Sequence, residues 1–133
     1  MASDVIRLAI LGSTGSVGRQ ALDVVRALPG RFRITGLAAG SNIALLRSQI
    51  DEFTPDTAWA LPSAESDMLA SELGRDRWHP LEAMASAPDV DVVLVATVGT
   101  AGLQPTLAAL RAKKAVALAN KEVLVMAGEL VTR

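Results

Sequence analysis

Three glycines spaced three residues apart stand directly behind a run of aliphatic residues, in the stretch ILGSTGSVG at 10–18. A loop of this kind between a strand and a helix can bind phosphate, because the first helical turn presents unpaired N–H groups and a partial positive charge. In that arrangement Gly12 permits the sharp turn, Gly15 lets the backbone approach a pyrophosphate, and Gly18 lets the helix pack against the sheet. Hydroxyl donors between the glycines come from Ser13, Thr14 and Ser16. The position favours a dinucleotide site, and the alternative is a tight turn that binds nothing.

The end of the second expected strand indicates which dinucleotide such a loop would bind. An NAD site usually places an acidic residue about 20 residues beyond the glycine loop, where it binds the ribose 2′-hydroxyl. Residues 24–50 contain no Asp or Glu. The strand instead ends in AAGSN, where Gly40 admits a close group while Ser41 and Asn42 offer uncharged donors. This favours NADP over NAD, and Arg47, one helical turn downstream, is the suggested basic partner of a 2′-phosphate.

A polar triplet, Asn120, Lys121 and Glu122, directly follows the last expected strand. Open α/β folds bind ligands at the carboxyl ends of their strands, so the triplet should face a cleft. There Lys121 could hold an anion or polarise a carbonyl group, and Asn120 could orient a nicotinamide or a substrate. The alternative is that Asn120 caps a helix while the two charged side chains are solvated. Position alone leaves both interpretations open.

These residues need a parallel sheet to bring them together, and the hydrophobic pattern predicts one. Apolar runs typical of buried strands alternate with stretches whose apolar residues recur at helical spacing. The expected strands cover 5–11, 32–39, 57–61, 90–97 and 115–119. The expected helices cover 18–28, 42–53, 63–74 and 103–114, with helical character again over 122–133 and only one or two helical turns in 77–90. The sequence therefore predicts an α/β fold with a doubly wound, Rossmann-like parallel sheet of about five strands and helices on both faces.

The composition argues against several classes of protein. The chain has 133 residues, 50% of them hydrophobic, which suits one domain with its own core. It contains no cysteine, so it has no disulfide framework, thiol nucleophile or thiolate metal site. Its scattered arginines and 3% of aromatic residues are unlike a nucleic-acid-binding face. No apolar run approaches the ~20 residues that span a bilayer and no signal or transit peptide is evident, so we expect a cytoplasmic protein without a membrane partner.

Four motifs occur in an order that resembles the 1-deoxy-D-xylulose 5-phosphate reductoisomerase family. They are GSTGSVG, AAGSN, VGTAGLQPTLAAL and ALANKEVLVMAG. With LDVVRALPGRFRITGLAAGSN, they extend the resemblance over nearly the whole chain, residues 56–89 excepted. The resemblance implies that 1–133 is an NADPH-binding domain and a fragment of a longer enzyme. A helical pattern that runs to Arg133 without a breaker agrees with that expectation.

The resemblance also implies an activity. Enzymes of this family rearrange 1-deoxy-D-xylulose 5-phosphate and reduce the resulting aldehyde with NADPH to 2-C-methyl-D-erythritol 4-phosphate, a step of isoprenoid biosynthesis, and they need Mg²⁺ or Mn²⁺. Their acidic metal ligands and substrate-phosphate ligands would lie beyond Arg133, so no metal ligand is expected in this chain. The family further implies a homodimer. The chain alone should bind the cofactor without turning over.

The same resemblance assigns roles to residues of the motifs. The pyrophosphate would be contacted by Thr14, Gly15, Ser16 and Val17. The 2′-phosphate would be surrounded by Gly40, Ser41 and Asn42, although some members have Lys at the position of Ser41. The adenosine and ribose side would be lined by Gly99, Thr100 and Ala101. The nicotinamide half would be contacted by Asn120 and Glu122, and the substrate by Lys121.

Other functions remain as alternatives. Homoserine dehydrogenases also have an Asn-Lys pair after a strand in this region, but their glycine loop is usually of the G-x-G-x-x-G kind. Acyl-phosphate reductases of the semialdehyde type share the loop spacing and need a cysteine nucleophile. A dinucleotide-sensing module without chemistry is a third alternative, against which Lys121 argues. An exposed apolar patch on the last helix is expected if a second domain docks there.

The remaining candidate side chains are expected to be structural. His79 should lie in a surface loop, and Trp59 and Trp78 should pack rather than stack on a ligand. The pair Asp89 and Asp91 stands at the amino end of a strand, the wrong end for a ligand. Core positions are expected for Met68, Met84 and Met126.

Overall fold

One sheet of parallel strands in the order β3-β2-β1-β4-β5 organises the chain. The structure is a computed structural model that describes residues 5–97 and 101–118. Its strands are β1 (Ile6–Leu11), β2 (Phe32–Ala39), β3 (Thr57–Ala60), β4 (Val92–Val95) and β5 (Ala115–Leu118). Its helices are α1 (Ser16–Ala27), α2 (Ile43–Phe53), α3 (Ala64–Leu73), the single 3-10 turn η1 (Arg75–Arg77), α4 (Leu81–Ser86) and α5 (Leu103–Arg111). The predicted Rossmann-like, doubly wound fold is confirmed.

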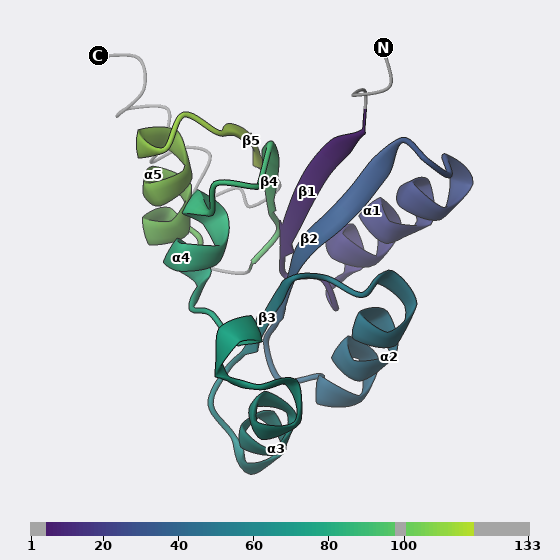
Figure 1. Ribbon diagram of the computed structural model, residues 1–133, viewed down its shortest axis with the longest axis vertical. Coiled ribbons are helices and arrows are strands. Elements are labelled where there is room, and N and C mark those ends of the chain that lie inside the picture. Colours follow the sequence, from purple (N-terminus) through teal and green to yellow (C-terminus); the bar gives the residue numbers. More distant parts are fainter. Residues whose placement is uncertain (1–4, 98–100, 119–133) are drawn as a thin grey trace.

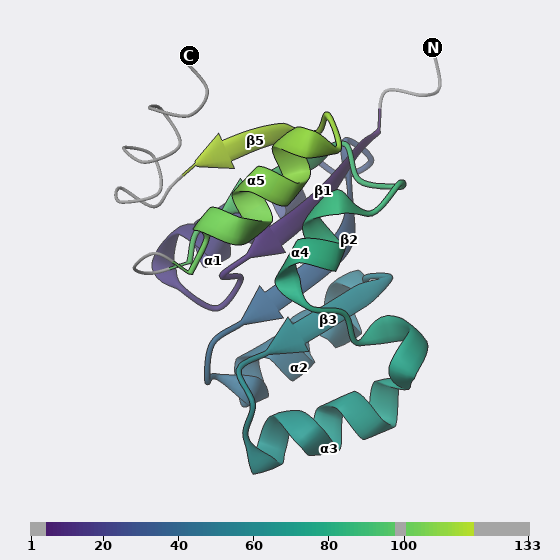
Figure 2. The same cartoon turned by 90° about the vertical axis from the view of Figure 1, so that its left-hand side faces the viewer.

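Helices cover both faces of the sheet, as Figures 1 and 2 show. The helices α1 and α2 pack on one face, where Leu22 and Leu46 join the core side chains of β1, β2 and β3. On the other face, α4 and α5 contribute Met84 and Ala109 to a second core cluster around Leu11 and the buried valines of β4. Alternate residues of the central strands point to opposite faces, so each strand contributes to both clusters. Helices on the two faces follow from right-handed crossovers that run outward from β1 and β4 in opposite directions.

The predicted boundaries agree closely with the structure where patterns are long. The strand β2 covers the predicted residues 32–39, and α3 begins after Ser63, whose hydroxyl caps the helix in a capping box with Ser66. The segment 77–90, predicted to be irregular with one or two helical turns, contains the end of η1 and the six-residue helix α4. Pro80 precedes α4, and Ala87, just before Pro88, follows its last residue, which keeps the helix too short for a periodic pattern to show.

The prediction that Met68 fills the core is wrong, because its side chain is 64% exposed. The helix α3 lies beyond the edge strand β3, where only one side of it meets the core, through Ser66 and Leu69. Met84, on α4, is fully buried as predicted. Both tryptophans pack against the core, Trp59 on the face of α4 and Trp78 on the face of α2.

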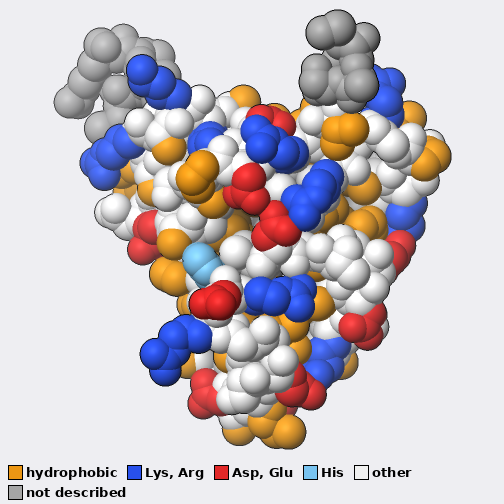
Figure 3. Space-filling model, in the orientation of Figure 1, with side chains coloured by type: hydrophobic (Ala, Val, Ile, Leu, Met, Phe, Trp, Pro, Cys, Tyr) orange, Lys and Arg blue, Asp and Glu red, His pale blue; other side chains and the backbone are white. Residues whose placement is uncertain are grey.

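Two ion pairs connect neighbouring strands or the residues just before them at the amino end of the sheet. Arg7 of β1 donates from Nη2 to Asp91 Oδ1 at 2.9 Å and from Nε to Asp91 Oδ2 at 3.0 Å. Arg33 of β2 makes a similar two-bonded pair with Asp56 at 2.6 and 2.9 Å. Figure 3 shows basic and acidic side chains intermingled on this view of the surface. Asp91 therefore has a structural role at the amino end of β4, as its position predicted.

Candidate functional site

The glycine loop leaves β1 in a turn that only glycine accommodates easily. Gly12 has φ of +96°, and a Cβ atom there would stand 2.6 Å from the carbonyl oxygen of Ala96. The N–H groups of Gly12 and Ser13 both donate to the carbonyl oxygen of Ala38, at 2.8 Å each. The turn is thus enclosed between the backbone that follows β4 and the end of β2, and the positive φ confirms the sharp turn predicted at Gly12.

Gly18 brings the first turn of α1 against this loop. A Cβ atom at Gly18 would stand 2.1 Å from the carbonyl oxygen of Gly12 and 2.7 Å from the Cα atom of Ser13. The sequence predicted a close approach of helix to sheet at this residue. The structure places that close approach between the helix and the loop itself, so the first turn of α1 packs directly against the loop.

Gly15 directly precedes α1, and a side chain added there would meet largely open space. It is the N-cap residue, and no side chain caps this helix among the residues that the structure describes. The first intrahelical bond runs from the N–H of Arg19 to the carbonyl oxygen of Gly15 at 2.9 Å, so the N–H groups of residues 16–18 precede the hydrogen-bonded ladder. A Cβ atom at Gly15 would meet only the carbonyl oxygen of Gly12, at 3.7 Å. This is a cradle with unpaired donors and room for an anion.

A cavity of about 320 Å³ opens beside this cradle at the carboxyl ends of β1 to β4. The predicted site residues that line it are Gly12, Thr14, Gly15, Gly40 and Ala101. Further lining residues, which the sequence did not point to as site residues, are Ala38, Ala39, Trp59, Leu61, Leu81, Ala96 and Thr97. None of these lining residues is acidic, and most are apolar. The cavity can therefore hold a flat apolar group next to an anion.

Trp59 and Leu61 lie at the carboxyl end of β3, and this position is the signal that could have identified them. Trp59 packs against the core and lines the cavity at the same time. The predicted packing of Trp59 is thus confirmed, but the prediction did not include its place in the cavity wall. The sequence around Leu81 does not mark it as a site residue. Leu81 belongs to α4, not to the end of a strand, and reaches the cavity only because of where α4 packs.

Ser13 lies inside the loop rather than along the cavity. Its side chain is fully buried, and its hydroxyl group has no hydrogen-bond partner among the described residues. Its carbonyl oxygen accepts a hydrogen bond from Gln49 Nε2 at 2.9 Å. Ser16 and Val17 are exposed at the start of α1. Ser16 and Val17, which were predicted to contact a pyrophosphate, are therefore exposed, whereas the neighbouring Ser13 side chain is buried inside the loop.

The end of β2 provides the other predicted contact region. Ser41 and Asn42 are both exposed. Asn42 caps α2, since its Oδ1 accepts from the N–H of Leu45 at 3.1 Å. Arg47, suggested as a basic partner of a phosphate, instead forms an ion pair with Glu72 of α3 and does not line the cavity.

Several predicted site residues lie outside the described part of the chain. They are Gly99, Thr100, Asn120, Lys121 and Glu122. The predicted apolar patch on the last helix and Met126 also lie there. Over residues 5–97 and 101–118, no group of three or more His, Cys, Asp or Glu side chains is arranged to hold a metal ion. In the same residues, no helix has the length and apolar character to cross a membrane.

Comparisons with known proteins assign the chain to a family. Residues 8–128 match the family model described as 1-deoxy-D-xylulose 5-phosphate reductoisomerase. A protein of that name from Chlorobium limicola is 48% identical over 131 residues, which are 94% of this chain and 34% of the relative. One from Pelodictyon phaeoclathratiforme is 50% identical with the same coverage. The chain thus spans about a third of the length of these relatives.

Solved structures give the same result. The crystal structure of a DOX-P reductoisomerase with NADPH, fosmidomycin and magnesium superposes with a TM-score of 0.84 at 41% identity, over 96% of this chain and 33% of that one. The reductoisomerase of Zymomonas mobilis in complex with NADPH gives 0.82 at 32% identity, over 96% and 35%. These matches favour the predicted family over the homoserine dehydrogenase and semialdehyde-type alternatives. The chain belongs to the 1-deoxy-D-xylulose 5-phosphate reductoisomerase family.

Proposed function

We propose that this chain binds NADPH as the cofactor domain of a 1-deoxy-D-xylulose 5-phosphate reductoisomerase. The observation that carries the proposal is the uncapped start of α1 at Gly15, with open space before it, beside a largely apolar cavity. The unpaired N–H groups suit a pyrophosphate, and the cavity suits an adenine ring. Relatives at 41% and 32% identity hold NADPH in their solved structures, which supports the choice of ligand.

In this proposal, a different group of residues contacts each part of the cofactor. The start of α1 from Gly15 to Val17, with Thr14, holds the pyrophosphate. Trp59 and Leu61 form a wall for the adenine ring, since both line the cavity. The 2′-phosphate lies at the end of β2, against Gly40, Ser41 and Asn42. Gly99, Thr100 and Ala101 line the adenosine and ribose side, whereas Asn120 and Glu122 contact the nicotinamide and Lys121 contacts the substrate.

The bound cofactor supplies a hydride for the reduction of a carbonyl group. The chain's own contribution is to bind and orient it. The cavity wall excludes water from the adenine side, and the α1 terminus neutralises part of the pyrophosphate charge. In the whole enzyme, the reaction would rearrange and reduce 1-deoxy-D-xylulose 5-phosphate, a step of isoprenoid biosynthesis.

The division of labour within a longer enzyme is part of the proposal. Residues 1–133 form the cofactor domain, and residues of the longer enzyme outside this chain supply the ligands of Mg²⁺ or Mn²⁺. The chain's span of about a third of its relatives supports this. We further propose a cytoplasmic enzyme that acts as a homodimer, and a chain that binds cofactor alone without catalysing the reaction.

Calorimetric titration of the 133-residue chain with NADPH and NADH tests the proposal. We expect NADPH to bind more tightly, and Gly15→Ala to weaken binding. The fold has room for a Cβ atom at that position, so the loss would reflect the space that the pyrophosphate needs. Equal affinity for both dinucleotides would contradict the NADP assignment, and failure to bind either one would contradict the cofactor site.

A further inference from the structure

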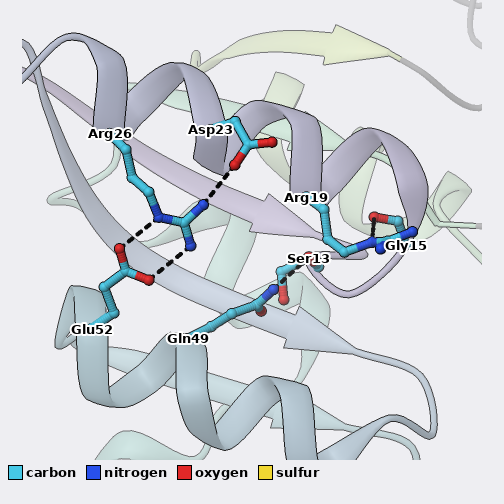
Figure 4. A network of polar contacts seen from close by, with 7 residues as sticks. All are labelled: Ser13, Gly15, Arg19, Asp23, Arg26, Gln49 and Glu52. Carbon is cyan, nitrogen blue, oxygen red and sulfur yellow. Dashed lines mark hydrogen bonds and ion pairs between the residues drawn. The ribbon is translucent and has the colours of Figure 1, made fainter.

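A buried glutamine on α2 reaches the glycine loop from a distant part of the chain. Gln49 is 3% exposed and lies beside the core residues Leu46 and Ile50. Its Nε2 donates to the carbonyl oxygen of Ser13 at 2.9 Å, across 36 positions of sequence. Figure 4 shows the side chain extending from α2 toward the loop between β1 and α1.

Burial of the polar Gln49 side chain is unfavourable for folding. Its Oε1 atom is buried and has no hydrogen-bond partner in the part of the chain that the structure describes. Burying an amide oxygen without a partner is unfavourable, and an apolar side chain of the same length would avoid that penalty. The one hydrogen bond that the amide makes goes to the loop, so the contribution of this residue lies in the geometry of the loop.

That hydrogen bond fixes the direction of a peptide group in the loop. The C=O and N–H groups of a trans peptide point in opposite directions. Because the carbonyl of Ser13 points toward α2, the N–H of Thr14 points away from α2. Thr14 lines the cavity, and none of the described residues accepts a hydrogen bond from its N–H group. Gln49 thus keeps this donor turned away from the helix and available to a ligand.

The helix that carries Gln49 is itself held against α1. Arg26 of α1 donates to both carboxylate oxygens of Glu52, at 2.6 and 2.7 Å, and its guanidinium carbon lies 5.1 Å from the ring centroid of Phe53. These contacts lie within about one helical turn of Gln49, as Figure 4 shows for Glu52. The loop is therefore hydrogen-bonded to two elements. Gln49 of α2 donates to the carbonyl oxygen of Ser13, and the N–H groups of Gly12 and Ser13 donate to the carbonyl oxygen of Ala38 in β2.

We infer that Gln49 is a positioning residue of the cofactor site, which sets the orientation of the Ser13–Thr14 peptide that faces the pyrophosphate. This inference rests on the proposed binding of NADPH. Gln49 touches no cofactor; it acts through the carbonyl oxygen of Ser13.

Titration of the chain and its Gln49→Met variant with NADPH tests the inference. Methionine matches the length of glutamine and lacks the donor. We expect NADPH affinity to fall about tenfold, equivalent to about 1.4 kcal/mol. Gln20→Met, at an exposed glutamine of α1, is the matched control and should bind like the unsubstituted chain. Equal affinity of the chain and Gln49→Met would overturn the inference, whereas failure of the unsubstituted chain to bind NADPH would overturn the proposed function and this role with it.

A second measurement needs no ligand. In the nuclear magnetic resonance spectrum of the unsubstituted chain, we expect a scalar coupling across the hydrogen bond between Gln49 Nε2 and the carbonyl carbon of Ser13. The Thr14 amide resonance should also shift in Gln49→Met and stay in place in Gln20→Met, a signature that a general loss of stability would not give. Absence of the coupling would overturn the inference even if NADPH binds.

Discussion

Gly18 and Gly12 touch across the loop that joins β1 to α1, so closely that a Cβ atom at Gly18 would stand 2.1 Å from the Gly12 carbonyl oxygen. Real Cβ atoms do not approach a carbonyl oxygen to that distance, so the contact requires glycine. Gly15, between the two, has no such neighbour within 3.7 Å. Two of the three equally spaced glycines, Gly12 and Gly18, are therefore required by the fold, whereas Gly15 is required only by the proposed cofactor site.

Replacement of Gly18 by alanine should destabilise the domain. The added methyl group forces the loop away from α1, at a cost of about 3 kcal/mol, the upper end for overpacked sites. Alanine's better helix propensity returns only about 1 kcal/mol. Urea unfolding should show the lower free energy of unfolding. Gly15→Ala is the matched control and should unfold like the unsubstituted chain, and similar losses in both variants would contradict this assignment.

Long local patterns made most of the fold predictable from sequence. Buried parallel strands appear as unbroken apolar runs, and β2 was predicted to the residue for that reason. The helix α4 was predicted only as one or two helical turns somewhere in 77–90, because its six residues show too little periodicity to give its bounds. Met68 was misplaced because its exposure depends on where α3 lies relative to the edge strand, and no pattern within a helix gives that information.

The candidate site divides in the same way. The loop residues Gly12 and Gly15 belong to a local motif, and the sequence predicts their position between a strand and a helix. Trp59 joins them only because β3 pairs with β2 at the edge of the sheet. Gln49 reaches Ser13 across 36 positions of sequence, and a single glutamine in an amphipathic helix is indistinguishable from a solvated one. Contacts set by topology are therefore the part that sequence patterns could not give.

Ser41→Asp should reduce the expected preference for NADPH over NADH about tenfold. Ser41 is exposed at the end of β2, where the proposal places the 2′-phosphate. A carboxylate there would repel that group by about 1–2 kcal/mol in high dielectric, so NADPH affinity should fall about tenfold while NADH affinity changes little. Titration with both dinucleotides measures this. Ser48→Asp, at an exposed serine further along α2, adds the same charge elsewhere and should leave the preference intact.

Trp59→Leu should weaken NADPH binding without unfolding the chain. The indole ring lines the cavity, and loss of its contact with an adenine ring should cost about 1 kcal/mol, or roughly a fivefold loss of affinity. Trp78→Leu is the control, since Trp78 packs on the opposite face of the sheet and does not line the cavity. It should lower stability and leave affinity unchanged. Loss of affinity in Trp78→Leu alone would place the adenine ring elsewhere.

Asp91 should make the stability of the domain depend on pH in the acid range. Its side chain accepts hydrogen bonds from the guanidinium and the backbone N–H of Arg7, and these lower the pKa of its carboxyl group from 3.8 to about 2. Between these two values the unfolded chain binds a proton that the folded chain does not. The stabilisation from the pair is therefore complete above about pH 5 and is lost as pH falls from about 4 to 2.

Asp91→Asn tests this dependence in urea unfolding at several pH values. The variant should be less stable than the unsubstituted chain at pH 7, and the difference should shrink as pH falls through that window. Asp23→Asn is the control, because Asp23 makes a single bond to Arg26 and its side chain is 73% exposed. Exposed pairs of that kind contribute little to stability. A pH-independent difference for Asp91→Asn would show that packing at the amino end of β4, rather than the charge of Asp91, holds β4 against β1.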